Sequence, residues 1–432
     1  MKTRFRTNRK AAVMAGFASV FAFSAQVYAQ NAAKSGDPQV SIPALPGGIP
    51  WGPVVAYPEA NLSVLYNDNI YQQPNREKSS TITVLTPSVK LEAIDGPHVY
   101  DVSARVVSGH YSGVSTADYT DFGFTGNAQW AFSGRAGLKL TAEYVDSHDD
   151  QGAIPGGTIH RKPNEWHQSS IKAMGGYGAP GAQGRVELTL GYASKRYDNY
   201  ERDAFGNPDN LKLNYDDTLV GGTFYWRVMP KTQLLFSATQ NVYDYTQKSF
   251  VTPPGSPPAG FAWTNLDSTQ RNYQVGVTWE AAAKTTGRFA IGHVTKDFSK
   301  SSLNDFSGTS WDASVNWRPL TYSTFDFATH STPSESQIGN ASFDKNFSVN
   351  WNHAWNSRLT TTAGYSYTKN EYEGNSGTVQ TDKTDAYGVR LNYQWQRNIR
   401  MGVGYEYSDR TSTDRTYEYD RNIFSIFLNA AI

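Results

Sequence analysis

The stretch FGFTGNAQWAF, residues 122–132, decides the fold of this chain. Its large apolar side chains occupy even-numbered positions, and its polar side chains the positions between: Phe122, Phe124, Ala128, Trp130 and Phe132 against Thr125, Asn127 and Gln129. A period of two predicts a β-strand with one apolar face and one polar face. The stretch YGVRLNYQW, residues 387–395, repeats the pattern.

The same alternation recurs along the chain about eighteen times, in segments of roughly ten residues that stop at turn residues. The expected strands lie near 57–67, 81–94, 98–111, 121–132, 136–148, 164–177, 185–198, 214–228, 232–245, 268–281, 286–298, 306–318, 322–332, 341–355, 358–372, 384–396, 398–409 and 417–432. Segments of this length and spacing, repeated so often, are typical of a transmembrane β-barrel.

The connections between these strands alternate in length. Tight turns such as 95–97, 133–135 and 229–231 follow even-numbered strands, and longer polar segments such as 149–163 and 246–267 follow odd-numbered ones. Bacterial outer-membrane barrels have short periplasmic turns and long external loops. The alternation therefore predicts an even number of strands.

Composition separates this chain from other membrane and β-rich classes. Mean hydropathy is -0.56, whereas aromatic residues make up 14% and include 27 tyrosines. No apolar run of about 18 residues follows the N-terminus, which argues against a helical membrane protein. A soluble β-helix or sandwich would have inner faces richer in Val, Ile and Leu. We therefore expect an all-β fold, a transmembrane antiparallel up-and-down β-barrel of about 18 strands.

The N-terminal residues predict export from the cytoplasm. A basic segment and an apolar segment, 11–23, precede the small-residue site Val27-Tyr28-Ala29. This order indicates a Sec-type signal peptide at 1–29. A Pro-rich periplasmic leader is expected at 30–56 and the barrel at 57–432. We expect the protein in the outer membrane of a Gram-negative bacterium.

Two further features of composition narrow the chemistry. The chain has no cysteine, which excludes disulfides, thiol catalysis and Cys-ligated metals. Formal net charge is zero, which disfavours nucleic acid as a partner.

The last expected strand is amphipathic to the final residue of the sequence. Phe424, Ile426, Leu428, Ala430 and Ile432 share one face. We expect this strand to be the segment by which the barrel assembly machinery recognises the chain, and outer-membrane lipid to contact its apolar face.

Charged residues in the expected strands should face the lumen, because Lys or Arg facing lipid at mid-depth costs roughly 2–4 kcal/mol. Twelve such residues are basic and eight acidic, which predicts a polar, mildly cationic interior. The expected pore-lining residues are Lys90, Arg105, Glu143, Lys172, Arg227, Arg390, Arg400 and Glu406.

Two kinds of chemistry compete with a pore and are disfavoured. His148, Asp149, Asp150 and His160 could hold a metal, but acidic loop tips are far commoner. His167 and Ser169 have the spacing of a lipid-facing His and Ser pair in outer-membrane phospholipases, a spacing that also arises by chance. We therefore expect no enzyme activity, cofactor or metal.

Two segments near the start of the barrel point to a family. They are LYNDNIY at 65–71 and ITVLTPSV at 82–89, with EKSS at 77–80 between them. They resemble the β-barrel porin type 2 group, and within it the EpsL-like outer-membrane proteins of exopolysaccharide operons. The resemblance implies a passive exit pore for a secreted polysaccharide that works with periplasmic export proteins. The alternatives are a general or solute-specific diffusion porin, and a structural or adhesive barrel.

Overall fold

The computed structural model describes residues 48–149, 162–179, 181–198, 213–246, 265–281, 284–334, 336, 340–375 and 377–432. The expected signal peptide and the leader up to residue 47 lie outside these ranges. Within them, no helix has the length and apolar character needed to cross a membrane.

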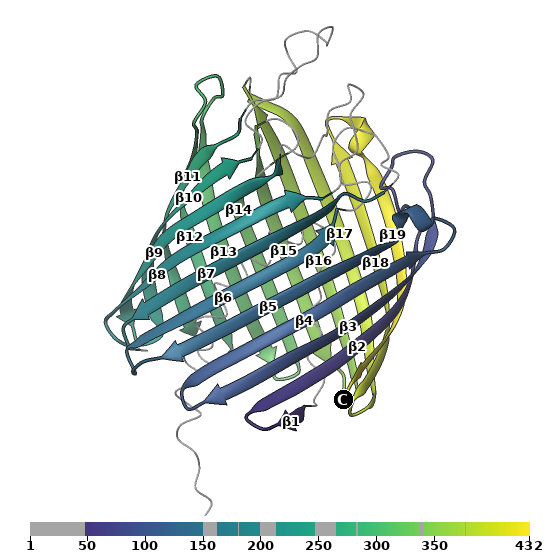
Figure 1. Cartoon of the computed structure of the whole chain (residues 1–432), viewed down its shortest axis with the longest axis horizontal. Helices are drawn as coiled ribbons and strands as arrows, with labels where there is room; N and C mark the ends of the chain where they lie inside the picture. The colour runs from purple at the N-terminus through teal and green to yellow at the C-terminus, as the bar shows by residue number, and fades with distance from the viewer. Residues whose placement is uncertain are drawn as a thin grey trace, which may run out of the picture.

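The described chain is almost entirely strand (Figure 1). The strands are β1 (Ile49–Trp51), β2 (Val54–Asn67), β3 (Ser80–Asp95), β4 (His98–Tyr111), β5 (Tyr119–Ala131), β6 (Ala136–His148), β7 (Glu165–Tyr177), β8 (Gly184–Tyr197), β9 (Tyr215–Met229), β10 (Thr232–Tyr245), β11 (Ser268–Ala281), β12 (Thr285–Phe298), β13 (Phe306–Leu320), β14 (Ser323–Ser334), β15 (Ala341–Ala354), β16 (Leu359–Gly374), β17 (Gly377–Gln396), β18 (Ile399–Ser412) and β19 (Tyr419–Ala431). Two short 3-10 turns, η1 (Ser115–Ala117) and η3 (Arg415–Tyr417), lie in connections.

Strands β2 to β19 form a closed antiparallel barrel of 18 strands, as the alternation predicts. Each strand pairs with the next along the chain, and the seam between first and last strands runs from Ile423 opposite Asn67 to Ala431 opposite Glu59. Closure removes the unpaired strand edges that an open sheet would expose to lipid.

Strand β1 covers the part of β2 that extends beyond the seam. The amide of Ile432 donates to the carbonyl oxygen of Pro58 (3.2 Å), and the last strand stops there. Residues 54–56 of β2 then pair with β1. The first barrel strand thus starts at Val54 instead of near residue 57, and β1 falls in the segment expected to be a leader.

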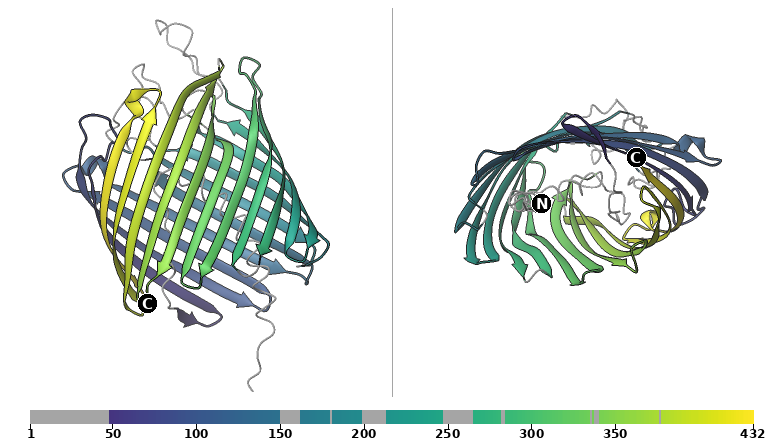
Figure 2. Two further views of the ribbon diagram at one scale, coloured as in Figure 1. Left: turned by 180° about the vertical axis from the view of Figure 1, so that it is seen from behind. Right: turned by 90° about the horizontal axis from the view of Figure 1, so that it is seen from below.

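The expectation of a long loop after the fifteenth barrel strand is wrong. Strand β16 continues to Gly374 and β17 begins at Gly377, where the sequence pattern placed strand ends at 372 and 384. Both strands rise above the rest of the wall at the end that carries the long loops (Figure 2, left). Apolar alternation does not mark this extension, because residues beyond the membrane need no lipid-facing side.

The two faces of the wall differ as a lipid-embedded barrel requires. Alternate side chains such as Phe124, Leu190, Val275, Tyr387 and Ile426 are exposed on the outer surface. The intervening side chains, mostly polar, point into the barrel. A polar interior surrounded by an apolar exterior is the reverse of a water-soluble protein.

Glycines allow the wall to bend sharply between β11 and β12. A Cβ on Gly292 would lie 1.8 Å from the carbonyl oxygen of Tyr273, and one on Gly276 would lie 2.2 Å from that of Phe289. Both positions are on the inner face, where a tight bend crowds side chains. The cross-section of the barrel is correspondingly elongated, and the teal and green strands turn one of its ends (Figure 2, right).

Three apolar clusters hold connecting segments to the inside of the wall at the long-loop end. One contains Tyr245, Leu266, Phe298, Leu303 and Ala341. The second is built on Ile70, Ile82, Val114 and Ala117. The third joins Trp166, Tyr197 and Leu213. The described parts of the long-loop rim are therefore packed against the barrel.

Candidate functional site: the lumen

All eight side chains expected to line the pore lie on the inner face of the wall, since each occupies a position on its strand that alternates with the outward-facing positions. Arg390, for example, lies between Val389 and Leu391, which are 45% and 41% exposed on the outer surface. Their presence on one face makes the lumen the candidate site. Their mutual contacts differ from residue to residue.

Strands β3 to β6 carry a hydrogen-bonded polar row. The ammonium group of Lys90 contacts Glu92 at 2.7 Å. On the adjoining strands, Asn127 donates to Asp101 (3.0 Å) and accepts from Thr141 (2.9 Å). Lys90 retains 45% side-chain exposure, so this wall presents accessible charge to the interior.

Glu143 and Lys172 lie close together on this side of the barrel. Glu143 of β6 is opposite Ser170 of β7, and Lys172 is opposite Thr141. The carboxylate and ammonium thus occupy diagonal positions, which long side chains can bridge. Arg105, in contrast, is exposed. It lies opposite Gly123, and a Cβ added to Gly123 would have no other atom within 4 Å.

A second charged group lies on β17 and β18. The guanidinium of Arg390 is 3.5 Å from the carboxylate of Glu406 and stacks over the ring of Phe427 at 5.1 Å. Arg400 lies nearer the short-turn end, is only 7% exposed and donates to Gln394 (3.3 Å). The ion pair of this group joins Arg390 and Glu406.

The region around Arg227 is more filled than the sequence suggests. Arg227 lies two residues beyond Tyr225, whose hydroxyl donates to Glu187 (3.0 Å) and whose ring packs under Arg185 at 4.1 Å. Leu235, opposite Tyr225, is fully buried. Tyr225, Leu235 and Ala290 form a packed apolar group on the inner face at this bend.

Alternation could have identified two further inner-face bases. Arg410 lies four residues beyond Glu406 on β18, and Arg421 lies on the same face of β19 as Ile423 and Phe427, opposite to the exposed Phe424. Arg410 stacks over Tyr419 at 5.1 Å, and Arg421 is 6% exposed. Both lie toward the long-loop end, where the apolar signal on the opposite face is weak.

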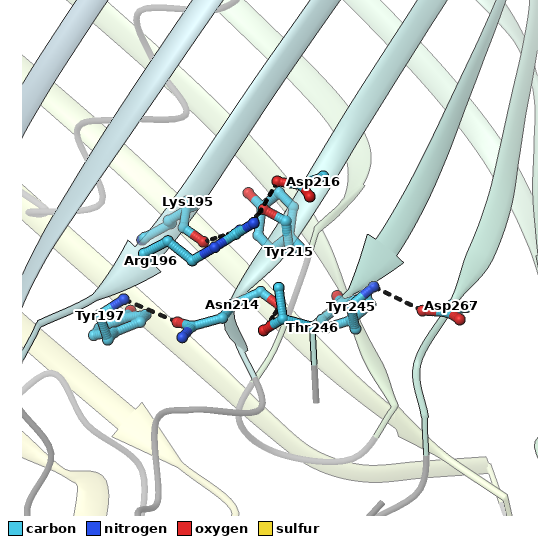
Figure 3. A network of polar contacts seen from close by, with 9 residues as sticks. All are labelled: Lys195, Arg196, Tyr197, Asn214, Tyr215, Asp216, Tyr245, Thr246 and Asp267. Atoms are coloured by element: carbon cyan, nitrogen blue, oxygen red, sulfur yellow. Dashed lines mark hydrogen bonds and ion pairs between the residues drawn. The ribbon is translucent and has the colours of Figure 1, made fainter. Parts of the chain in front are cut away.

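Polar contacts tie the ends of β8, β9 and β10 together at the long-loop rim (Figure 3). Arg196 donates to the carbonyl of Tyr215 and to Asp216, both at 2.7 Å. The amides of Tyr197 and Tyr245 donate to Asn214 (2.9 Å) and Asp267 (2.7 Å). These bonds replace backbone pairing where the strands end, and they fix this side of the mouth.

The described residues cover the two competing chemistries only in part. Asp150 and His160 lie outside the described residues, and His148 contacts Asp121 at 2.8 Å. No group of three or more potential metal ligands occurs in the ranges that are described. His167 and Ser169 do share the lipid-facing side, but the imidazole bonds to Asp198 (2.8 Å), and no bond joins it to Ser169.

Comparison with known proteins adds a family to this geometry. Residues 43–431 match the family described as "Putative beta-barrel porin 2". None of the curated proteins gives a significant match.

Similar solved structures include three outer-membrane proteins. The FrpB iron transporter of Neisseria meningitidis has 11% identity and a TM-score of 0.46, with 82% of this chain and 62% of FrpB covered. OccAB4 of Acinetobacter baumannii has 11% identity and a TM-score of 0.45, covering 87% and 98%. OpdL of Pseudomonas aeruginosa has 12% identity and a TM-score of 0.45, covering 88% and 98%. The chain thus spans under two thirds of FrpB, and this level of likeness says nothing about substrate.

Proposed function

Because this chain belongs to the β-barrel porin family that it matches over residues 43–431, we propose that it forms a diffusion channel for small polar solutes across an outer membrane. The observation that carries the proposal is the distribution of charge. Lys90, Arg105 and Glu143 lie on the inner face of a closed 18-strand wall whose outer face is apolar. A barrel of this strand number is wide enough for an aqueous passage.

The interior favours small solutes over a bulky polymer. Inner side chains pack against one another at the bend around Leu235, and the clusters at the long-loop rim fill part of the mouth. Lys90 and Arg105 on β3 and β4 present exposed charge to the interior. A solute that carries its own charges or hydroxyl groups would exchange water for these side chains at little cost.

The export role implied by the EpsL-like resemblance has no support beyond the two short segments that suggested it. The family that the chain matches is described only as a β-barrel porin, with no mention of a polysaccharide. A diffusion porin, the alternative expected from the sequence, therefore fits better than an exopolysaccharide exit pore.

Reconstitution of the full chain into planar bilayers and liposomes tests this proposal. We expect discrete conductance steps, and liposome swelling that falls as sugars grow from monosaccharide to tetrasaccharide. An absence of conductance would contradict the channel and favour the structural barrel.

Deletion of the gene separates the channel from the export pore. Slower uptake of small polar solutes with unchanged surface polysaccharide is the expected result. Loss of surface polysaccharide with polymer retained in the periplasm, restored by the wild-type gene, would overturn the diffusion proposal.

A further inference from the structure

The short-turn end of the barrel carries a set of exposed bases that the channel does not use. Eight turns lie at this end, following β3, β5, β7, β9, β11, β13, β15 and β17. Five of them contain a basic residue, and we call this set the basic rim: Arg135, Lys231, Lys284, Arg358 and Arg397. None of the eight turns contains Asp or Glu; Asp95 is the last residue of β3, and Glu280, whose backbone amide donates to the carbonyl oxygen of Lys231 (2.9 Å), is the last but one of β11.

The basic rim is accessible and uncompensated in the described part of the chain. All five residues are exposed. None of their side chains forms a hydrogen bond or ion pair with a described residue. Exposed bases without a carboxylate partner give this end of the barrel a positive potential that attracts anionic groups.

Large exposed side chains on the lipid side lie next to these bases. They are Phe132 (63% exposed), Met229 (63%), Tyr322 (50%), Trp355 (58%) and Trp395 (52%). Trp355 is three residues from Arg358, and Trp395 is two residues from Arg397. Tyr and Trp settle at the boundary between acyl chains and headgroups. Their position places the basic rim at the depth of the headgroups.

We infer that the basic rim binds the phosphate groups of anionic phospholipids in the periplasmic leaflet of the outer membrane. Short turns of such barrels face the periplasm, and both β1 and the C-terminal residue lie at this end (Figure 1). Bases near a membrane surface attract anionic lipid. Two observations favour lipid over an anionic protein or solute: the bases are spread around the barrel rather than gathered in one patch, and they adjoin lipid-facing side chains.

Spin-label measurements on the reconstituted full chain test the inference. Phosphatidylglycerol and phosphatidylcholine, each carrying a labelled acyl chain, compete for the protein surface in a phosphatidylethanolamine bilayer. We expect wild-type protein to prefer phosphatidylglycerol by about threefold to fivefold, a size typical of single bases at a membrane surface.

Two variants with five substitutions each distinguish an effect of the position of the bases from an effect of the protein's net charge. The rim variant carries Arg135→Gln, Lys231→Gln, Lys284→Gln, Arg358→Gln and Arg397→Gln. The control variant carries Arg76→Gln, Lys78→Gln, Lys300→Gln, Lys383→Gln and Arg415→Gln, five exposed residues at the long-loop end with the same change in charge. We expect the preference to fall to near unity in the rim variant and to persist in the control.

Three results would overturn the inference: no preference in the wild type, an equal loss in both variants, or a preference that survives in the rim variant. If the rim variant instead changed ion selectivity and left lipid association intact, the rim would serve anionic solutes entering the channel. Conductance is measured on the same samples, so failure of the proposed channel and failure of the lipid site are seen separately.

Discussion

The carboxylate of Asp68 holds Asn422 across the seam of the barrel with both oxygens: one accepts the backbone amide of Asn422 (2.7 Å) and the other its side-chain amide (2.8 Å). Asn69, fully buried, extends the contact by donating to the carbonyl of Asp420 (2.9 Å). The paired register between β2 and β19 ends at Asn67, and one more backbone bond follows it, from the amide of Asp68 to the carbonyl oxygen of Asn422 (3.2 Å). The Asn-Asp-Asn segment therefore continues the seam with side chains after the ladder has ended.

Removing this contact should loosen the seam. Asp68→Ala eliminates two charge-assisted bonds, each worth about 1.5–3 kcal/mol, so we expect the free energy of unfolding to fall by about 3 kcal/mol. Reversible urea unfolding in vesicles measures it, and a double-mutant cycle with Asn422→Ala should give a coupling energy of about 1–3 kcal/mol.

Asp118 supplies a matched control for the seam variant. It accepts the amide of Tyr111 (2.7 Å) within a single hairpin, away from the seam. Asp118→Ala should weaken that hairpin locally and leave the rate of barrel opening unchanged. Equal effects of the two substitutions on opening would argue against a special role for the seam contact.

The bend at β11 and β12 should tolerate no side chain at Gly292. A Cβ there overlaps the backbone of Tyr273, so Gly292→Val should prevent the native barrel from forming rather than merely destabilise it. Heat-modifiable migration on gels reports folding. Gly123→Ala, where no atom lies within 4 Å of the new Cβ, should fold like the wild type. Normal folding of Gly292→Val would show that the wall bends elsewhere.

Charge on the accessible wall should control ion selectivity. Arg105 is exposed inside the barrel, so Arg105→Glu should move the reversal potential in a salt gradient toward cation preference by several millivolts. Arg415→Glu makes the same charge change in an outer connection and should have a smaller effect. Equal shifts would mean that the general field of the protein, rather than the lumen, sets selectivity.

Asn375 at the tip of the β16–β17 extension should steady the mouth. Its side chain accepts from Asn304 (3.2 Å) and Asn340 (2.9 Å) and donates to the carbonyl of Ser302 (3.0 Å). Asn375→Ala removes all three bonds, each worth about 1 kcal/mol. We expect greater current noise at unchanged mean conductance; a silent variant would show that the tip has no part in the mouth.

The sequence predicts the strands of the barrel wall better than it predicts the contacts between side chains inside the lumen. Strands β4, β6 and β10 have the expected bounds, because tight turns follow or precede each of them and mark their ends. Strand β1 was missed since three residues with a central proline carry no periodicity, and the start of β17 was missed because it is polar on both faces.

In the lumen, the sequence predicts which face a side chain occupies but not which side chains it contacts. Alternation assigns Arg390 and Glu406 to the inner face, but their proximity depends on strand register, which a single sequence does not provide. Leu235 and Phe427 also face inward, among the polar and charged side chains that the sequence predicts there. Leu235 is buried at the bend that Gly276 allows, and the ring of Phe427 packs under Arg390 and over Gly402; neither contact follows from periodicity.

The short strand β1 is the most weakly held strand at the start of the barrel. It is joined to β2 by three residue pairs, whereas the seam with β19 has nine. A pull on the chain ahead of Ile49 would unzip those three pairs one after another and only then reach Val54. Tension on this end of the chain would thus separate β1 from β2 before it reached the closed wall.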